Sequence, residues 1–433
     1  MNLISKFKNK IFLNSIWIIL EKLIALFGLI FVTSFVAKYI GPESFGKLSF
    51  ATTIFAVVQT LAIWGTDVIC SKRIAQNHDS GLRLLKSISL LRAIVFFVTS
   101  IPLLIYMWIE TDYLSFIFAL AVGVSAYISV QDIYILYNDV TLKAIYNVFA
   151  NIVGLIISLI LRFIIAYFEL DVIYLVFPII LIALIPFFIR RYIFNKNNQN
   201  ILSFNKIKSR IKYSKYVLRT GSSLVVSALA ITIYLNISQI LLGLMVSKKS
   251  LGIFTVGVTL GSAWSFVNNA FLTSFTPKLY QSKGNAEASS VAANISRIMT
   301  IFFIIYMTTF YFLGEYLIKK LYGNDYIEAF NIALILIVST FLSNLGQVYA
   351  RYMFLYNGFN YIMYKTFILM FFGVVSAYFL INKYQIYGAA FTILIVEIFS
   401  LTFFNYLFRR FEILKAQMVI FGFVRNVEND QRN

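Results

Sequence analysis

The chain is almost devoid of cysteine and histidine. Its 433 residues include a single Cys, Cys70, and a single His, His78. One cysteine cannot form a disulfide within the chain, and a metal site of the His and Cys kind would have too few ligands. A Ser-His-Asp or Cys-His arrangement would have to use His78, which lies in a polar, basic stretch. We therefore predict no catalytic residue, no metal and no cofactor, and we expect that the protein is not an enzyme.

Charged residues are also scarce. Only 13% of the residues are charged, whereas 60% are hydrophobic, and a soluble domain usually carries about 25% charge. The core of a soluble protein of this size cannot bury so many apolar side chains, because most of its surface has to be solvated. The lipid bilayer is the solvent that accommodates the surplus, so the composition predicts an integral membrane protein.

Apolar stretches long enough to span a bilayer, roughly 20 residues each, recur about twelve times. Short polar breaks such as Gly41-Pro42, Asn138-Asp139 and Asn357-Gly358 separate them. The sequence therefore predicts an all-α integral membrane protein with about twelve transmembrane helices. These helices are expected near residues 12–37, 45–69, 88–109, 113–137, 145–168, 172–194, 217–246, 251–275, 292–314, 328–350, 362–381 and 387–408.

The distribution of Lys and Arg predicts the orientation in the membrane. With a cytoplasmic N-terminus, the two tails and the even-numbered connections carry 28 of the 37 Lys and Arg residues, and the odd-numbered connections carry 7. Cytoplasmic segments hold the excess of Lys and Arg, so we predict that both termini face the cytoplasm. The net charge of +19 then reflects membrane topology, and we expect no nucleic-acid binding.

A basic connection divides the chain into two halves. Residues 190–219 contain nine Lys and Arg side chains and no acidic residue. These basic residues either contact anionic lipid headgroups or, at Lys215 and Arg219, attract an anionic substrate. We predict a six-helix N-terminal lobe over 1–195, a basic cytoplasmic connection over 196–216, a six-helix C-terminal lobe over 217–410 and a cytoplasmic tail over 411–433.

The two halves contain related motifs. Ser44-Phe45-Gly46 follows the first predicted span, and Ser250-Leu251-Gly252 follows the seventh. Internal repeats are typical of transporter folds, whose substrate site lies between the halves. Because each half contains six spans, the halves have the same orientation, and we predict parallel repeats related by a pseudo-two-fold axis along the membrane normal.

Two longer motifs resemble those of a known family. Residues 37–46 (AKYIGPESFG) are similar to the signature A-R-x-L-G-P-x-x-F-G of polysaccharide flippases, and residues 234–243 (YLNISQILLG) are similar to Y-x-x-x-D-Q-I-x-L-G. The acidic residue of the second motif is replaced by Ser238 here, so an ion-coupling role at that point does not carry over. Further elements of the pattern follow in order: Gly65, Lys72-Arg73-Ile74-Ala75, Gly252, Pro277, Leu321-Tyr322-Gly323 and Tyr387-Gly388-Ala389-Ala390.

The resemblance covers roughly residues 10–410 and identifies the chain as a member of the Wzx-type flippases, within the multidrug, oligosaccharidyl-lipid and polysaccharide exporter (MOP) superfamily. It implies a V-shaped fold of two six-helix lobes around a cavity. It also implies transfer of undecaprenyl-diphosphate-linked oligosaccharide units across the bacterial inner membrane by alternating access, for O-antigen (lipopolysaccharide) or capsule synthesis. The expected partners are this lipid-linked substrate, membrane lipids, H⁺ or Na⁺ as coupling ion, and a polysaccharide polymerase.

Charged residues inside predicted spans are functional candidates. Glu21 and Lys22 lie in the first span and point about 100° apart. Lys22 either faces the cavity or snorkels to the headgroups, while Glu21 is then neutral or paired. Arg162 either binds the substrate diphosphate through its bidentate fork or snorkels outward, with Glu169 nearby. We predict that the following residues bind the anionic substrate: Lys22, Arg73, Arg162, Lys215 and Arg219.

Buried acids are candidates for ion coupling. Glu397 lies in the middle of the last predicted span, and with Glu21 it is predicted to take up the coupling ion. Asp67 is instead expected to pair with Lys72 or Arg73. Positions 172–286 contain no acidic residue, and neutral polar side chains there either bond neighbouring helices or line a hydrated path. For the hydrated path we select Asn236, Gln239, Asn268 and Asn269.

Two other functions stay open at this point. A drug/cation antiporter of the same superfamily would need buried acids such as Glu21 and Glu397, although the acid-free seventh and eighth spans argue against it. A non-transporting partner that organises glycosyltransferases or a polymerase is supported only by the basic connection.

Overall fold

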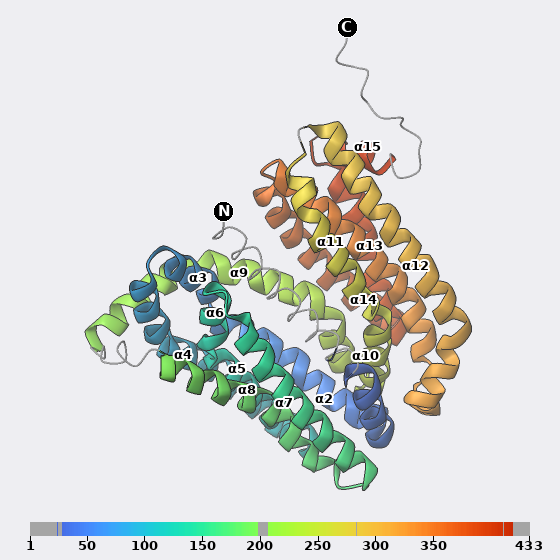
Figure 1. The fold of residues 1–433 in the computed structure, drawn as a ribbon. Coiled ribbons are helices and arrows are strands. Elements are labelled where there is room, and N and C mark those ends of the chain that lie inside the picture. The colour runs from blue at the N-terminus through green and yellow to red at the C-terminus, as the bar shows by residue number, and fades with distance from the viewer. Residues whose placement is uncertain (1–23, 25–27, 198–206, 283, 410, 419–433) are drawn as a thin grey trace. The chain divides into compact units, whose positions relative to one another are not determined.

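The computed structural model describes residues 24, 28–197, 207–282, 284–409 and 411–418. Within these residues the regular secondary structure consists of helices, without any β-strand (Figure 1). The chain divides into two compact units, Met1–Thr232 (unit 1) and Ile233–Asn433 (unit 2). The division falls inside one helix, α9 (Ile207–Met245). The predicted basic connection over 196–216 lies partly outside the described residues, and the predicted lobe boundaries stay predictions.

Unit 1 is built from helices that pack side by side. Helix α5 packs against both α2 and α8, and α7 packs along α8. A cluster of buried apolar side chains from α3, α4 and α6, including Ile74, Leu85 and Tyr137, forms part of its core. Besides the first part of α9, the elements are η1 (Gly28–Val32), α2 (Thr33–Ile63), α3 (Thr66–Gln76), α4 (His78–Glu110), α5 (Tyr113–Gln131), α6 (Ile133–Val140), α7 (Ala144–Tyr167), η2 (Val172–Leu175) and α8 (Val176–Asn197).

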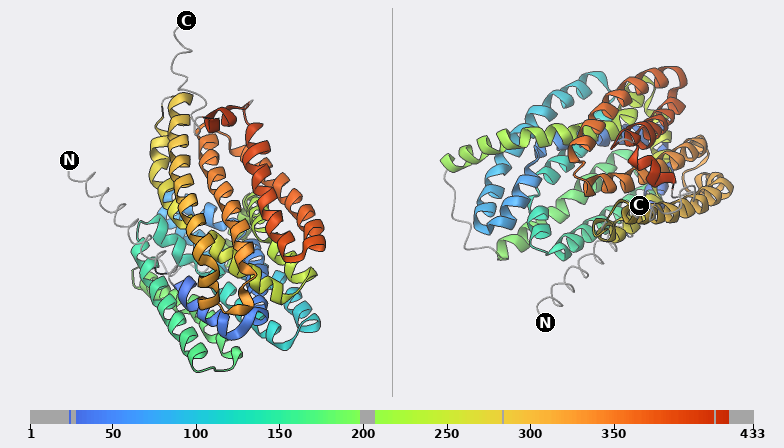
Figure 2. Two further views of the ribbon diagram at one scale, coloured as in Figure 1. Left: turned by 90° about the vertical axis from the view of Figure 1, so that its right-hand side faces the viewer. Right: turned by 90° about the horizontal axis from the view of Figure 1, so that it is seen from above.

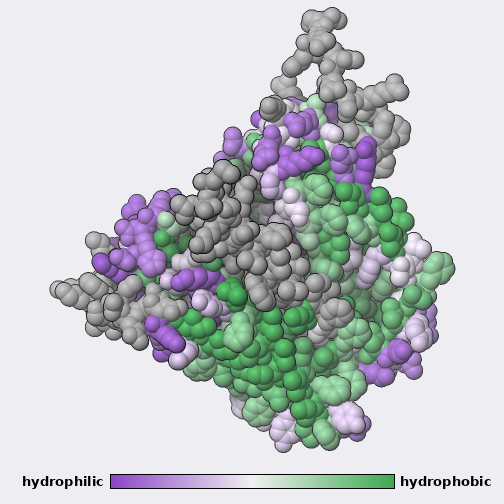
Figure 3. Space-filling model, viewed as in Figure 1, coloured by the Kyte–Doolittle hydropathy of each residue, from purple (hydrophilic) through white to green (hydrophobic). Residues whose placement is uncertain are grey.

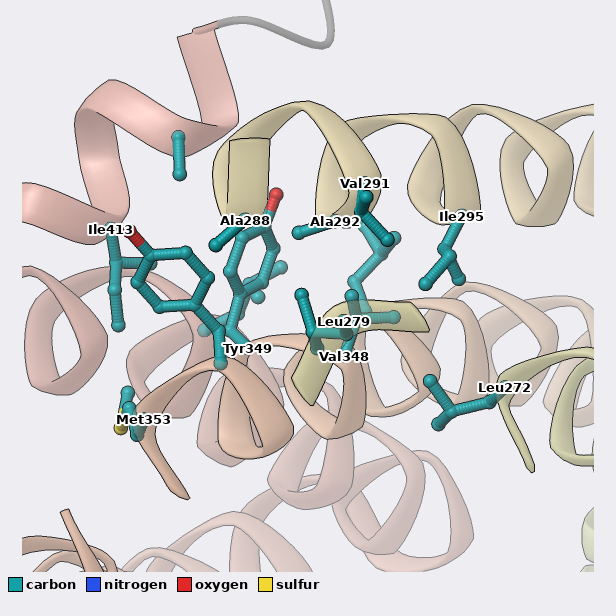
Figure 4. Close-up of a cluster of buried hydrophobic side chains, with 14 of the residues drawn as sticks. Leu272, Leu279, Ala288, Val291, Ala292, Ile295, Val348, Tyr349, Met353 and Ile413 are labelled. Atoms are coloured by element: carbon teal, nitrogen blue, oxygen red, sulfur yellow. The ribbon is translucent and has the colours of Figure 1, made fainter. Parts of the chain in front are cut away.

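Unit 2 is organised around α13. This helix packs against α10, α12 and α14, and Figure 2 shows the yellow-to-red helices of the unit lying side by side. Tyr349 of α13 contributes to a buried cluster with Ala292 of α12 and Ile413 of α15 (Figure 4). The elements are α10 (Lys248–Ser262), α11 (Ser265–Tyr280), α12 (Asn285–Leu321), η4 (Asn324–Tyr326), α13 (Ala329–Leu355), α14 (Phe359–Phe399), η5 (Ser400–Phe404) and α15 (Glu412–Met418).

The helices have the length and composition of membrane spans. Ten segments of the described chain are long and apolar enough to cross a membrane. The first of them is broken at Gly41, where φ is 74°, and the last is broken at Gln385, where φ is 51°. A positive φ suits Gly41 because glycine has no Cβ to clash. The first predicted span, 12–37, lies mostly outside the described residues. Among the residues that the structure describes, the ten candidate spans agree roughly with the predicted twelve, and the predicted all-α membrane fold is confirmed.

Several helix boundaries differ from the prediction. Helix α4 begins at His78 rather than at 88, because Asn77 caps it by accepting a hydrogen bond from the backbone N–H of Ser80 at 3.0 Å. The predicted helix 45–69 is interrupted at Trp64, which adopts a left-handed conformation, and 113–137 is interrupted at Asp132. Hydropathy measures the apolar part of a span, so it reports neither polar end turns nor internal breaks.

The outer faces of the helices are apolar. Ile109 of α4 and Phe312 of α12 are 69% and 73% exposed. Figure 3 shows apolar residues along the sides of the helices and hydrophilic residues gathered mainly toward their ends. Large exposed apolar side chains would be poorly solvated in water, whereas lipid tails accommodate them. Together with the ten candidate spans, this surface is that of a multi-pass membrane protein.

The single cysteine lies in the core of unit 1. Cys70 of α3 is completely buried. Burial raises the pKa of its thiol to about 12, the nearby Arg92 opposes this rise and Asp67 adds to it. The thiol is therefore protonated at neutral pH and is shielded from solvent.

Candidate functional site

Helix α14 folds back on itself in unit 2. Gln385 adopts φ 51° and ψ −123°, which separates α14 into two helical segments. Gly388 permits their close approach, because a Cβ at this position would lie 2.0 Å from the carbonyl oxygen of Leu380. The rings of Phe372 and Phe399, one from each segment, lie 5.0 Å apart. The two segments are thus antiparallel neighbours, a helical hairpin.

The second segment of this hairpin ends in a π-helical turn, η5 (Ser400–Phe404). A π-turn changes the direction of side chains along a helix and is frequent at functional sites. The fully buried Asn405 follows directly, and its Oδ1 accepts a hydrogen bond of 2.7 Å from Nζ of Lys365. The hydroxyl of Tyr361 donates to the carbonyl oxygen of Phe404. The end of the hairpin is therefore held together by polar contacts between its two segments.

A cavity of about 160 Å³ lies between this hairpin, α13 and one side chain of α9. Its polar lining includes Tyr234 of α9, Ser343 and Gln347 of α13, and Lys365 and Glu397 of α14. All of these residues belong to unit 2. The cavity is large enough for several water molecules, since one water occupies about 30 Å³ in the liquid. We name it the Glu397 cavity.

Glu397 is the acid of this cavity and is 7% exposed. The Tyr234 hydroxyl donates a hydrogen bond of 2.6 Å to its Oε1, and the Ser343 hydroxyl supplies a second hydrogen bond. A carboxyl group in this setting has two chemical options. It can take up a proton, or it can bind a cation together with the hydroxyl oxygens around it.

Lys365 brings the opposite charge to the same cavity. It interacts electrostatically with Glu397, and its ammonium group donates a hydrogen bond to Oδ1 of Asn405. Among the described residues that line the cavity, Lys365 and Glu397 are the charged ones. The cavity can thus hold a carboxylate and an ammonium whose charges cancel.

A second, smaller cavity of about 50 Å³ shares Tyr234 and Glu397 with the first. It is also lined by Ser238 of α9 and Thr392 of α14. The Ser238 hydroxyl is buried, and it has no hydrogen-bond partner among the described residues. Glu397 therefore borders two cavities. Ser238 occupies the position at which the family motif has an acidic residue. It lines the smaller cavity together with Glu397, whose carboxyl group comes from another helix, α14.

Residues 11–283 match the family described as Polysaccharide biosynthesis protein. The chain belongs to this family. No curated protein sequence matches the chain.

Solved structures show that this family member shares the fold of MOP superfamily transporters. A structure of the lipid II flippase MurJ in an inward closed conformation is 14% identical, covers 95% of this chain and 91% of its own, and gives a TM-score of 0.69. An inward-facing multidrug resistance MATE transporter of the MOP superfamily is also 14% identical, with coverage of 92% and 95% and a TM-score of 0.64. A MOP superfamily transporter from Pyrococcus furiosus is 15% identical, with coverage of 96% for both chains and a TM-score of 0.55. The predicted resemblance is confirmed for family and fold.

The predicted cationic residues of this polysaccharide biosynthesis protein occupy separate places. Lys22 and the nearby acid Glu21 lie outside the described residues. Arg73 is exposed on α3, and its Nε donates to Oγ of Ser80 at 2.9 Å. Arg162 is half-buried in α7, and within the described part of the chain its side chain has no ion pair with Glu169.

Lys215 and Arg219 lie one turn apart on α9, and both are exposed. Residues four apart on a helix share one face, so these two cations form a small basic patch on unit 1. Their predicted role in binding the substrate stays a prediction.

The predicted polar residues differ in burial. Asn236 and Gln239 of α9 are half-buried, and Asn269 of α11 is exposed. Asn268 is completely buried, and neither polar atom of its side chain has a hydrogen-bond partner in the part that the structure describes. None of the four lines the Glu397 cavity. Their role in a hydrated path stays a prediction.

The structure also contains two buried arginines, Arg190 and Arg92. In the sequence they do not differ from the Lys and Arg residues of the cytoplasmic connections. Arg190 of α8 is 4% exposed and donates from Nε to Oδ2 of Asp132 at 2.9 Å and from Nη2 to the same atom at 2.5 Å. Its Nη1 donates to Oδ1 of Asn151 at 2.7 Å. These bonds tie the end of α8 to the break between α5 and α6 and to α7.

Arg92 of α4 forms a similar network. It donates to Thr66, to Oδ1 of Asp67 at 2.5 Å and to the carbonyl oxygen of Val130 at 2.9 Å. The expectation that Asp67 pairs with Lys72 or Arg73 is wrong. Those cations follow on the same helix and point outward, whereas Arg92 reaches Asp67 from the neighbouring helix.

Proposed function

We propose that this protein transfers undecaprenyl-diphosphate-linked oligosaccharide units from the cytoplasmic to the outer leaflet of the bacterial inner membrane, for the synthesis of O-antigen or capsule. The observation that carries the proposal is the family match over residues 11–283 on a fold of at least ten membrane spans. The likeness of fold to a lipid II flippase supports a lipid-linked substrate. The excess of Lys and Arg in the tails and even-numbered connections supports cytoplasmic termini.

The chemistry of the substrate explains why a protein is needed. A glycan exposes many hydroxyl groups, and each polar group without a partner costs roughly several kcal/mol in hydrocarbon. A protein that hydrates the glycan and neutralises the diphosphate lowers this barrier. In the proposal, Lys22, Arg73, Arg162, Lys215 and Arg219 bind the anionic groups, Asn236, Gln239, Asn268 and Asn269 line the path, and the transport cycle is one of alternating access.

Glu397 is the proposed site of ion coupling. Glu397 is buried and borders two cavities. Its carboxyl group accepts hydrogen bonds from hydroxyl groups, such as that of Tyr234, which can reorient when the charge of the carboxyl group changes. Uptake of a cation or proton changes the charge in this part of unit 2. A change of this kind can favour one conformation over another if the ion binds the two with different affinity. Glu21 is the second candidate for this role.

Deletion of the gene in its native bacterium tests the proposal. The measurement is the surface polysaccharide together with the pool of undecaprenyl-linked oligosaccharide. We expect loss of the surface glycan and accumulation of complete repeat units on the inner leaflet, both restored by the wild-type gene. Unchanged surface glycan and an unchanged lipid-linked pool, in a strain without a second flippase, would reject the proposal.

A drug/cation antiporter is the alternative function. Two observations favour it: a buried carboxyl group in a cavity and the fold shared with multidrug transporters. The two functions are separated by measuring resistance to cationic drugs. A flippase confers little resistance when it is overproduced, whereas an antiporter lowers drug accumulation in a manner that depends on Glu397.

A further inference from the structure

We infer that Lys365 is the internal counter-cation of Glu397 and that it excludes Na⁺ and other alkali cations from the Glu397 cavity. The inference rests on the proposed function and deepens it, because it names which ion can act at the coupling site. Lys365 would thereby determine ion specificity.

Without Lys365, the cavity has the composition of a cation site. Glu397 supplies a carboxylate, and Tyr234 and Ser343 place hydroxyl oxygens beside it. Carboxylate and neutral oxygen ligands are those that hard cations prefer. The cavity of about 160 Å³ also has room for a cation with water molecules. The chemistry of the oxygen atoms alone would therefore favour cation binding.

The position of Lys365 changes this balance. Its side chain lines the same cavity, and its ammonium group acts electrostatically on Glu397. In a site sheltered from bulk water, charges interact much more strongly than in solution. A Na⁺ ion near Glu397 would therefore be repelled by the ammonium, while the carboxylate already has a positive charge nearby. Binding of the ion would gain little and would cost part of its hydration.

Asn405 keeps the ammonium in place. Its Oδ1 accepts from Nζ of Lys365 at 2.7 Å, and the asparagine itself is completely buried behind the π-helical turn η5. The Nδ2 atom of Asn405 is buried without a partner among the described residues. If the side-chain amide of Asn405 were rotated by half a turn, its N–H group would face the Lys365 ammonium, and two hydrogen-bond donors would oppose each other. The amide is therefore favoured with its carbonyl oxygen toward Lys365. The lysine is thus a fixed part of the cavity wall.

The ammonium also opposes the addition of a proton to Glu397, because both carry a positive charge. A proton nevertheless differs from Na⁺ in how it binds. It adds to the carboxylate itself, needs no coordination shell and occupies no volume in the cavity. The need for a coordination shell, which Lys365 obstructs for Na⁺, therefore does not apply to protonation of Glu397.

The test is binding of ²²Na⁺ to the purified full-length protein in detergent, measured by scintillation proximity. We expect no saturable binding to the wild-type protein. Lys365→Met removes the ammonium and should create saturable binding of about one ion per chain. The double variant Lys365→Met/Glu397→Gln should lose this binding. Lys365→Arg, which keeps the charge, and Lys383→Met, which removes an exposed lysine from the same hairpin, should behave as the wild type does.

Two results would overturn the inference. One is saturable ²²Na⁺ binding by the wild-type protein that Glu397→Gln abolishes. The other is a Lys365→Met protein that binds no ²²Na⁺ although it elutes from gel filtration and melts as the wild type does. If Lys365→Met does not fold, Lys365→Gln takes its place, since an amide retains a hydrogen bond to Asn405. The ion alone is the probe, so the outcome is independent of the glycan phenotype that tests the proposed function.

Discussion

Tyr234 of α9 donates a hydrogen bond of 2.6 Å to Glu397 of α14, 163 residues later in the chain. The carboxyl group is therefore oriented by a helix that crosses the division between the two units. A change in the charge of Glu397 alters this bond directly, because a protonated carboxyl accepts hydrogen bonds less strongly than a carboxylate. The bond connects the proposed coupling site with α9.

Tyr234→Phe should reduce transport without reducing the amount of protein in the membrane. The variant loses one hydrogen bond, worth about 1 kcal/mol, so we expect transport to fall roughly five-fold. Glu397→Gln, which can no longer change its charge, should abolish coupled transport. Tyr378→Phe is the matched control, because Tyr378 is an exposed tyrosine of the same hairpin. Recovery of surface glycan in a deletion strain is the measurement, and equal recovery by all three variants would contradict this role.

Asp132→Ala should destabilise unit 1 strongly. The substitution leaves Arg190 buried without its carboxylate, and breaking a buried ion pair in this way costs about 3–5 kcal/mol. Glu315→Ala removes the exposed ion pair with Lys319, and such pairs are worth about 0–1 kcal/mol. Thermal unfolding in detergent compares the two. A loss no larger for Asp132→Ala than for Glu315→Ala would show that the buried pair contributes little.

Gln385→Gly should stabilise the protein. Gln385 has φ 51° and ψ −123°, a conformation that is strained for a residue with a side chain and costs about 1–3 kcal/mol. Glycine relieves this strain but increases the entropy of the unfolded chain, so we expect a net gain of about 1 kcal/mol. Gln281→Gly is the control, since Gln281 has φ −87° and offers no strain to relieve. A lower melting temperature for Gln385→Gly than for the wild type would refute the assignment.

The double substitution Lys22→Ala/Arg162→Ala should impair transport and leave the protein in the membrane. Lys22 lies in a predicted span, and Arg162 lies in the observed helix α7. A cation inside a span is energetically costly unless it has a partner. A substrate diphosphate would supply that partner. The expected result is accumulation of lipid-linked units on the inner leaflet. Lys319→Ala, at the exposed end of α12, serves as the control. Full activity of the double variant would exclude a cationic cavity built on these two residues.

The parts of the fold that depend on hydropathy could be predicted from the sequence. The spans were visible because each is an apolar run of bilayer length, and the break at Gln385 falls between the two predicted helices 362–381 and 387–408. Glu397 was visible for a related reason, since a carboxyl group in the middle of an apolar run is rare. These signals are local in the chain.

The partners of Glu397 could not be predicted in this way. Lys365 lies near the edge of an apolar run, where a lysine usually reaches the headgroups, and nothing in its surroundings in the sequence indicates Asn405 forty residues later. Arg92 and Arg190 were indistinguishable from the positive residues of cytoplasmic connections for the same reason. Which edge cations turn inward is decided by the packing of other helices, and a single sequence does not encode that locally.

The burial of Cys70 has a practical consequence for spectroscopy. The native protein behaves as a cysteine-free background toward thiol reagents, because its one thiol is inaccessible and protonated. Spin labels or fluorophores can therefore be attached at introduced cysteines, one in each unit, without first replacing a core residue. Distances between such probes would report directly on how the two units are arranged and how that arrangement changes during a transport cycle.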